Sequence, residues 1–213
     1  MAQTRIDTQG DLRPKGMRDE TRGAGETPAP AIGDPAPLGL AAFALTTFVL
    51  SCANAGLLKE AGAFIPLAFF YGGATQFAAG MWEFRNKNTF GATAFSSYGG
   101  FWIALGFFFM FGAQLGVATS AQAIGATLLA WTIFTIYMWV ASYRTTGAVF
   151  LVFSLLLLTF ILLTWGALGK STTATHIGGW LGILTALAAW YASAAGVINS
   201  TFGRALLPVF ARV

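Results

Sequence analysis

The chain has 213 residues, of which 56% are apolar and only 9% are charged, and its formal net charge is +4. A soluble domain needs charge on roughly a quarter or more of its surface positions. This composition therefore excludes an ordinary water-soluble protein and predicts one that lies in the lipid bilayer. Beyond residue 34 the basic side chains stand at the ends of apolar segments, which is typical of membrane topology signals and gives no basic face for a nucleic acid.

Residues 1–34 differ sharply from the rest of the chain. They hold eleven of its twenty charged side chains and are rich in Gly and Pro. This stretch lacks the apolar core of a signal peptide, and it has too little apolar surface to fold. We therefore predict two regions, a disordered N-terminal tail over 1–34 and a membrane domain over 35–213.

Charged and polar runs divide the remainder of the chain into six apolar segments. Their approximate bounds are 38–58, 62–82, 94–111, 124–142, 148–168 and 177–198. Each has about 18–22 residues, the length that an α-helix needs to cross the hydrocarbon core. The apolar runs are continuous, whereas the strands of a membrane β-barrel alternate. We predict an all-α membrane protein with six transmembrane helices.

The first segment carries three polar side chains and one aromatic ring on one helix face. They follow one another at intervals of four, four and three residues. They are Phe43, Thr47, Ser51 and Asn54. Such a stripe can line a polar path through the membrane, or it can join helices by hydrogen bonds, as Ser, Thr and Asn commonly do. Spacing alone leaves both interpretations open.

The second segment predicts close helix packing. Pro66 lies near its start, where a missing N–H group costs least. Gly72 and Gly80 lie one turn before and one turn after Gln76, so the three form a small-residue face with one amide. A buried amide must be paired or hydrated, which makes Gln76 a second candidate for a polar path.

The polar run EFRNKNTFG at 83–91 separates the second and third segments. Asn88 and Thr89 are good N-cap residues for the third helix, and N–H groups at a helix start can face an anion. Glu83 either forms an ion pair with a basic neighbour in this run or has a gating role. We favour a cytoplasmic vestibule formed by Glu83, Asn88 and Thr89.

Basic residues in the short loops predict the orientation. If the N-terminus is cytoplasmic, the outer loops hold only Lys59 and Lys170. The inner loops and the C-terminal stretch then hold Arg85, Lys87, Arg144, Arg204 and Arg212. The positive-inside rule therefore predicts a multi-pass protein of the cell membrane with both termini in the cytoplasm.

Reactive side chains are scarce. The single cysteine, Cys52, excludes an intramolecular disulfide and a thiolate metal cluster, and the single histidine, His176, excludes a multi-histidine site. We expect His176 in a solvated loop before the sixth segment. Beyond Asp34 the carboxylates are Glu60 and Glu83, too few for paired-carboxylate chemistry. The inventory predicts that the protein is not an enzyme and has no catalytic residue, metal or cofactor.

Three stretches of the chain resemble a known transporter family. The chain reads DPAPLGL at 34–40, FYGGATQFAAGMWEFRNKNTFGATAFSSYGG at 70–100 and FGRALLPVF at 202–210. In this order on six segments they resemble the acetate uptake transporter family, the succinate–acetate permeases, over roughly residues 34–210. The family's first motif usually begins with Asn where this chain has Asp34, and Asp caps a helix start as well as Asn does.

The resemblance implies a six-helix protomer with cytoplasmic termini, a homo-hexamer, and one pore in each protomer. It implies that acetate and related short carboxylates, succinate included, are the cargo. It also implies a narrow apolar constriction of one Phe, one Tyr and one Leu. The family pattern assigns these to Phe43, to Tyr98 in the Ser-Tyr-Gly piece, and to Leu155 after Phe-Ser. The polar residues of the first two segments would then line the same path.

Two mechanisms and one other class of function stay open. A proton-coupled symporter usually needs a titratable group in its path, and Glu83 and His176, the candidates, both lie near segment edges. This favours a channel, or an acid that carries its own proton. A membrane sensor that binds acetate without moving it is the alternative of another class, and the lack of a folded soluble domain in the sequence counts against it.

Overall fold

The computed structural model describes residues 32–114, 116 and 120–211. Most of the predicted disordered tail, residues 1–34, therefore lies outside the described residues. Asp34–Val213 form one compact unit, and the account below is confined to the described part of that unit.

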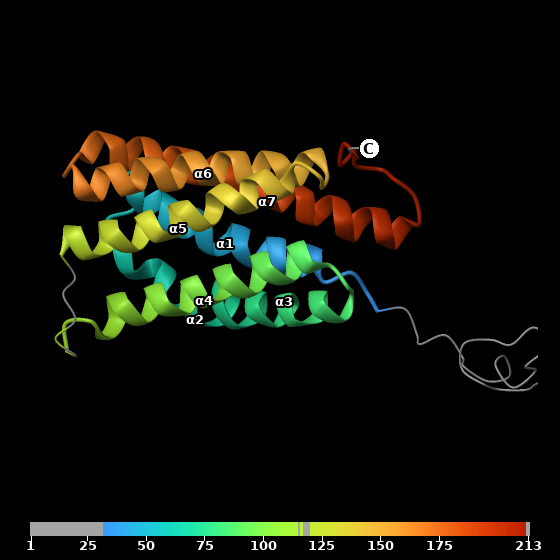
Figure 1. Ribbon diagram of the computed structural model, residues 1–213, viewed down its shortest axis with the longest axis horizontal. Coiled ribbons are helices and arrows are strands. Elements are labelled where there is room, and N and C mark those ends of the chain that lie inside the picture. The colour runs from blue at the N-terminus through green and yellow to red at the C-terminus, as the bar shows by residue number, and fades with distance from the viewer. Residues whose placement is uncertain (1–31, 115, 117–119, 212–213) are drawn as a thin grey trace, which may run out of the picture. The chain divides into compact units, whose positions relative to one another are not determined.

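This unit is built from helices that run back and forth along one direction (Figure 1). The long ones are α1 (Ala36–Asn54), α4 (Thr89–Phe111), α5 (Ala121–Ser142), α6 (Gly147–Leu168) and α7 (Thr172–Phe202). All five are long and apolar enough to cross a membrane, and they correspond to every predicted segment except the second. Among the described residues there is no strand, and one isolated bridge pairs Thr146 with Ala211.

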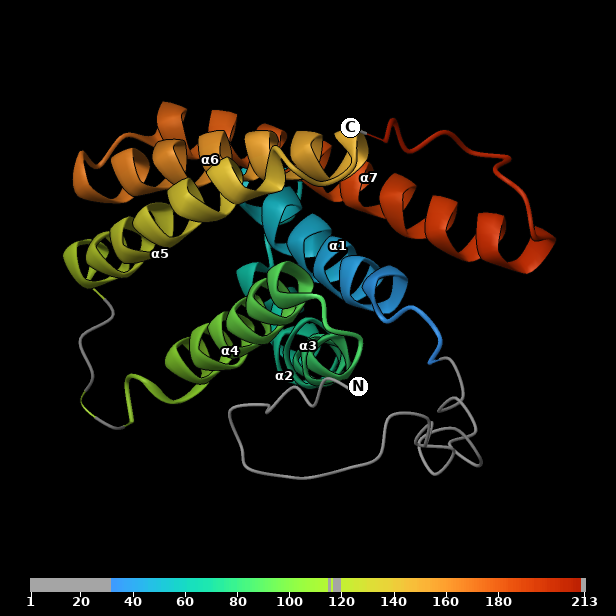
Figure 2. The ribbon, with the colours of Figure 1, turned by 45° about the vertical axis from the view of Figure 1, so that its right-hand side comes forward.

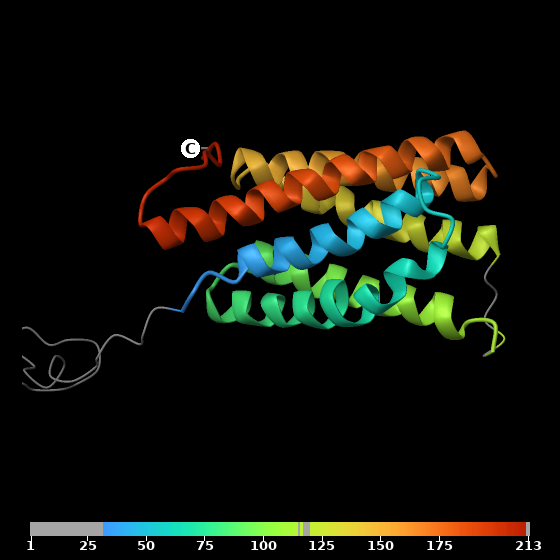
Figure 3. The same cartoon turned by 180° about the vertical axis from the view of Figure 1, so that it is seen from behind.

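The second predicted segment is helical, but it is not one continuous α-helix. It consists of η1 (Ala61–Phe64), α2 (Ile65–Phe69), the π-helix η2 (Phe70–Thr75) and α3 (Gln76–Arg85). These pieces follow one another alongside α4 (Figure 3). They take the place of the second predicted crossing.

Glycines explain the break in this segment. A Cβ atom on Gly73 would collide with the Ala68 carbonyl oxygen, and one on Gly72 would collide with the Thr46 side chain on α1. Thr75 Oγ1 donates to the Phe70 carbonyl oxygen at 2.9 Å, five residues earlier, which is the interval of a π turn. The predicted small-residue face therefore allows η2 to approach α1 closely.

The helix α1 lies between two groups of helices (Figure 2). On one side it packs against α7, which packs against α6, and α6 packs against α5. On the other side it packs against η2 and α3, and both pack against α4. The α4 and α5 helices meet through aromatic side chains, with the ring centroids of Phe101 and Trp131 5.0 Å apart.

Polar caps start several helices earlier than the apolar pattern predicts, and the difference is largest for α4 and α7. Asn88 Oδ1 accepts from the Gly91 N–H group at 3.0 Å, so α4 begins at Thr89. Ser171 Oγ accepts from an N–H group in the first turn of α7, which begins at Thr172. A helix begins where a side chain satisfies its free N–H groups. His176 therefore lies in the second turn of α7, exposed, and the prediction of a loop histidine is wrong.

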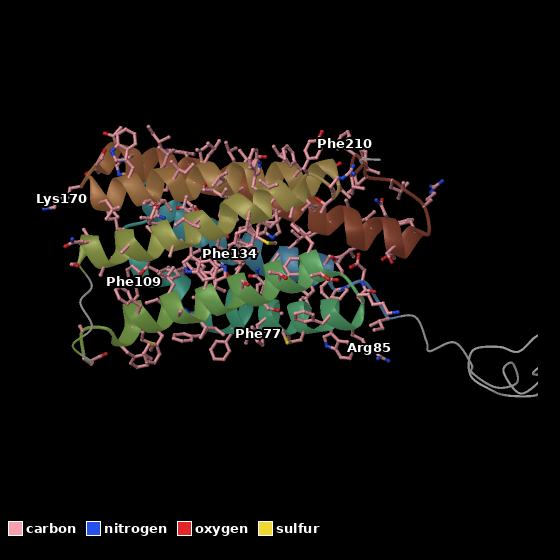
Figure 4. All side chains as sticks on the ribbon, in the orientation of Figure 1. Phe77, Arg85, Phe109, Phe134, Lys170 and Phe210 are labelled. Atoms are coloured by element: carbon pink, nitrogen blue, oxygen red, sulfur yellow. The ribbon has the colours of Figure 1, made fainter. Side chains whose placement is uncertain are left out.

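Basic side chains gather at the two ends of the unit. Figure 4 shows Lys170 at one end and Arg85 at the other. Lys59 follows α1 at the Lys170 end, while the turns at the Arg85 end carry Lys87, Arg144 and Arg204. The start of α1 and the end of α7 also lie at the Arg85 end (Figure 1). This distribution is the one that the loop charges predict.

Candidate transport pathway

Three cavities follow one another along α1. The central cavity, of about 240 Å³, is enclosed by α1, α4, α5, α6 and the start of α7. The mouth cavity, of about 390 Å³, shares Asn54, Ala167 and Thr175 with it and lies at the end that carries Lys170. The inner cavity, of about 20 Å³, adjoins the opposite end of the central cavity. Together they trace an interrupted path from the Lys170 end into the middle of the unit.

The lining of the central cavity is neutral. Its polar members are Thr47, Ser51, Asn54, Tyr98, Trp102, Thr159 and Thr175. The remaining described residues around it are apolar, and none of them is Asp, Glu, Lys, Arg or His. A solute in this cavity would meet hydroxyl, amide and indole groups between apolar walls.

An apolar partition separates the central cavity from the inner one. Phe43 of α1, Tyr98 of α4 and Leu156 of α6 line both cavities. All three side chains are buried, and the ring centroids of Phe43 and Tyr98 lie 6.0 Å apart. Side chains from three different helices therefore meet at one level of the path.

Leu155, the leucine assigned from the family pattern, does not belong to this partition. Its side chain is half-buried and lines neither cavity, while the adjacent Leu156 lines both. Successive residues of a helix point about 100° apart, so a shift of one residue turns a side chain off the cavity face. The residues of α6 that face the two cavities are Val152, Phe153, Leu156, Thr159, Phe160, Leu163 and Ala167. Leu156, and not Leu155, therefore lies at the level of Phe43 and Tyr98.

Tyr98 is held in place by α5. Its hydroxyl lies 2.9 Å from Thr135 Oγ1, which donates its own hydrogen to the Trp131 carbonyl oxygen at 2.7 Å. Tyr98 must therefore be the donor to Thr135, and its hydrogen is not free for a carboxylate. The rings of Trp131 and Phe134 pack on Tyr98 with centroids 5.8 and 5.3 Å away, and Figure 4 shows Phe134 between α5 and α4. Tyr98 thus contributes an aromatic wall to the partition.

The predicted polar stripe of α1 faces the central cavity, which is lined by Phe43, Thr47, Ser51 and Asn54. Gln76 lies on the other side of the partition, against the inner cavity, and is 1% exposed. Three buried polar atoms in the two linings have no hydrogen-bond partner: Thr47 Oγ1, Gln76 Oε1 and Trp102 Nε1. An unpaired buried group costs about 1–3 kcal/mol, so these three atoms are the energetically unfavourable polar groups of the two linings.

The mouth cavity is lined by two basic side chains, Lys170 and His176. Hydroxyl groups of Ser171, Thr172 and Thr175 lie beside them in the same lining. A basic side chain at an opening raises the local concentration of anions. The mouth therefore favours anions, whereas the central cavity that follows it carries no charge.

Comparison with known proteins identifies the family. A family model described as GPR1/FUN34/yaaH matches residues 19–211 of this chain. The chain belongs to this family. It is 43% identical over 194 residues to Acetate permease A of Emericella nidulans, a match that covers 83% of this chain and 65% of that protein.

Bacterial members of the GPR1/FUN34/yaaH family match over almost their whole length. The chain is 36% identical over 180 residues to the succinate-acetate/proton symporter SatP of Escherichia coli, which covers 84% of this chain and 95% of that protein. The solved structure of the bacterial acetate channel SatP matches with a TM-score of 0.80 at 35% identity, over 84% of this chain and 99% of that one. With five apolar membrane-length helices among its described residues, this family member is a multi-pass membrane protein.

Several residues of the pathway in this GPR1/FUN34/yaaH protein were not predicted from the sequence, among them Leu156 and Trp102. Leu156 stands in a run of four leucines, which gives no signal for its register. Trp102 follows Tyr98 by four residues, the same interval that relates Thr47 to Phe43. That interval was a usable signal, because residues four apart share a helix face.

The predicted vestibule residues of this family member lie outside the three cavities. Glu83 is in the last turn of α3 and is fully buried. Its Oε2 atom accepts from Asn86 Nδ2 at 3.5 Å, its Oε1 atom has no partner, and no basic side chain of the described residues pairs with it. Asn88 uses its side chain to cap α4, and Thr89 is exposed. The Glu83 carboxyl is enclosed where α3 meets α4, so the predicted ion pair with Arg85 or Lys87 is not formed.

We expect Glu83→Gln to retain or raise thermal stability, by about 2–4 °C for each kcal/mol gained. The amide keeps the shape of the side chain and can still accept from Asn86, while it removes a buried charge that lacks a full set of partners. Unfolding in detergent measures the stability, and the matched control is Glu60→Gln at an exposed glutamate. Flux per folded molecule tests the vestibule role: unchanged flux in Glu83→Gln would overturn it, and altered flux with normal stability would support it.

Proposed function

We propose that this protein is a membrane channel or permease for acetate and other short-chain carboxylates, with one pore in each protomer. The observation that carries the proposal is the row of three cavities, which runs from a basic mouth through a neutral chamber to an apolar partition. Membership of a family whose relatives include an acetate permease and an acetate channel supports acetate as the cargo.

The neutral chamber suits rapid passage of a small anion. A carboxylate without a cationic partner binds weakly in a low-dielectric site, because its charge loses hydration. Hydroxyl, amide and indole donors offset part of that cost. Weak binding favours throughput, since a substrate that binds tightly leaves slowly. Lys170 and His176 at the mouth supply the attraction that the chamber lacks.

We propose that the partition of Phe43, Tyr98 and Leu156 is the constriction of the pore. Its three side chains are apolar or have their polar group occupied, so it selects by size and by ease of dehydration. Acids with a short tail then pass more readily than bulky ones. Succinate, with two carboxylates, must lose more hydration and belongs among the poorer candidates for the cargo.

The mechanism that we favour is channel-like. A proton-coupled symporter needs a titratable group in its path, and the described lining of the central and inner cavities holds none with an ordinary pKa near neutrality. We further infer that the Arg85 end is cytoplasmic, because the basic turns gather there. A homo-hexamer in the cell membrane completes the proposal, on the strength of the family resemblance.

Flux in proteoliposomes tests the function. We expect labelled acetate to equilibrate across vesicles that hold the protein, at equal pH of 8 on both sides, faster than across protein-free vesicles. A symporter would instead accumulate acetate only when the outer side is more acidic. Saturable binding of acetate without flux would overturn transport and favour the sensor. Repeating the assay with formate, propionate, lactate and succinate defines the cargo.

A further inference from the structure

Another cavity lies between α4 and α5, beside the central cavity. This lateral crevice has a volume of about 210 Å³ and is lined by residues from 101–108 of α4 and from 124–131 of α5. Ala104 and Thr127 of its lining are exposed. The crevice therefore opens to the surroundings of the protein, and it is not one of the three cavities of the pathway.

The crevice exists because α4 and α5 are not each other's main packing partners. α4 packs mainly against the pieces of the second segment, and α5 packs mainly against α6. Aromatic rings bridge the two helices instead, with the ring centroids of Phe101 and Trp131 5.0 Å apart. The helices run in opposite directions (Figure 1), so the residues that follow this ring pair toward the Lys170 end come from both of them. Their side chains, Ala104 and Thr127 among them, leave the space between the helices unfilled.

The lining of the crevice is apolar. Among the described residues it holds no charged side chain. Its one hydroxyl, Thr127 Oγ1, donates to the Ala123 carbonyl oxygen at 3.0 Å, and the Trp131 indole is its other polar group. A water molecule needs several polar partners, and an apolar cavity without them stays dry. The occupant that fits this lining is therefore apolar.

The crevice joins the outer surface of α4 to the wall of the central cavity. Ala104 and Phe108 also line a groove of about 450 Å³ along α4. On the inner side, Leu105 and Leu128 line both the crevice and the central cavity, and both are half-buried. At this level the side wall of the central cavity is thus only one layer of side chains thick.

The bilayer supplies the molecule at this depth. Both α4 and α5 are long and apolar enough to cross a membrane, and the crevice lies within their spans. The surrounding medium is then the hydrocarbon core, whose tails are as apolar as leucine. A helix of a second copy is about 10–12 Å wide with its side chains, too wide to enter the crevice, whereas a single flexible acyl chain can follow it inward.

We propose that an acyl chain of a membrane lipid occupies the lateral crevice and completes the side wall of the central cavity. An unfilled gap deprives its lining of dispersion contacts, and the chain restores them. The crevice lies toward the Lys170 end, so the chain comes from the leaflet at that end. The lipid is then a structural part of the pathway, outside the space through which the solute moves.

The test uses the full chain in phosphatidylcholine nanodiscs, with its seven tryptophans replaced by 5-fluorotryptophan. A fraction of the lipid carries a nitroxide in the middle of one acyl chain, which broadens the fluorine resonances near it. The Trp131→Phe and Trp139→Phe variants identify two of the resonances. We expect Trp131 to broaden severalfold more than Trp139, which is half-buried on the same helix but lines none of the cavities described here.

Two phenylalanine variants form a matched pair. Ala104→Phe fills the crevice from α4, so it should reduce the broadening of Trp131 severalfold and leave that of the exposed Trp165 unchanged. Ala126→Phe adds the same ring at an exposed position of α5 that lines none of these cavities, and Trp131 should broaden as in the wild type. Sharp resonances without the nitroxide report that each variant is folded. The wild-type comparison of Trp131 with Trp139 stands without either variant.

Each other outcome overturns the lipid site. A Trp131 resonance that the labelled lipid does not broaden would show that no chain enters the crevice. Broadening that appears only after the protein is dispersed into single chains would show that a second copy covers it. Equal broadening in the wild type and in Ala104→Phe would mean that the label reaches Trp131 by another route, and broadening by a water-soluble nitroxide alone would mean that the crevice is hydrated. Acetate flux enters none of these measurements, so the lipid site and the proposed function are tested separately.

Discussion

Replacing Leu156 by Ala should let larger acids pass. The change removes most of one of the three partition side chains and widens the boundary between the central and inner cavities. One methylene more or less in an apolar pocket changes discrimination by roughly 10- to 200-fold. We therefore expect the ratio of lactate to acetate flux to rise about tenfold or more, with acetate flux retained. Competition between the two labelled acids in proteoliposomes measures this ratio.

The neighbouring leucine provides a sharp control. Leu155→Ala removes the same atoms one position earlier, from a side chain that lines neither cavity. It should leave the lactate-to-acetate ratio at the wild-type value. If Leu155→Ala changed the ratio and Leu156→Ala did not, the register of α6 at the partition would be wrong by one residue and the family assignment would be restored.

The helices of this protein were largely readable from the sequence, because apolar length is a strong signal. Three predicted segments end at the residues where α4, α5 and α6 end, Phe111, Ser142 and Leu168. Their starts were predicted too late where a polar cap opens the helix. The first turn after a cap such as Asn88 or Ser171 still contains polar residues, so hydropathy misses it.

The break in the second helical segment could not be predicted from the sequence. Its glycines were recognised as a packing face, but the π-helix at Phe70–Thr75 depends on how closely Gly72 meets Thr46 on another helix. A tertiary contact of this kind cannot be deduced from the spacing within one segment. The burial of Glu83 has the same origin, since it depends on the turn of α3 onto α4 and a charge pattern favours exposure.

The candidate site was likewise predictable from the sequence only in part. Helical spacing was enough to gather one face of α1 at the central cavity, since four residues from Phe43 to Asn54 fix that face. It was not enough on α6, where Leu155 and Leu156 are chemically identical and only packing decides between them. Trp102 and the free state of the Thr47 hydroxyl required coordinates, because a missing partner has no sequence signal.

The contact between α1 and α7 lies beside the mouth cavity, which residues of both helices line. Small residues on α7 let the two helices approach closely. A Cβ atom on Gly179 would lie 2.7 Å from Ala55 Cα and would also strike the Ala55 backbone nitrogen. Asn54, the residue before Ala55, lines both the central and the mouth cavities. Gly179 therefore contacts the backbone beside a residue whose side chain lines the pathway.

Gly179→Ala should be the most destabilising single methyl addition in this pair of helices. The neighbouring atoms are backbone, so they cannot rotate away, and overpacking of this kind typically costs about 1–3 kcal/mol or more. The higher helix propensity of Ala compared with Gly stabilises the folded state by only about 1 kcal/mol. The unfolding midpoint in detergent should fall by several degrees, and acetate flux should fall with it because α1 must move at Asn54.

The control is Gly100→Ala on α4, where an added Cβ has no atom within 4 Å. At that position only the greater helix propensity of Ala acts, so the unfolding midpoint should rise. A Gly179→Ala protein as stable as Gly100→Ala would mean that α1 and α7 can move apart at this level, and it would contradict the close contact between Gly179 and Ala55.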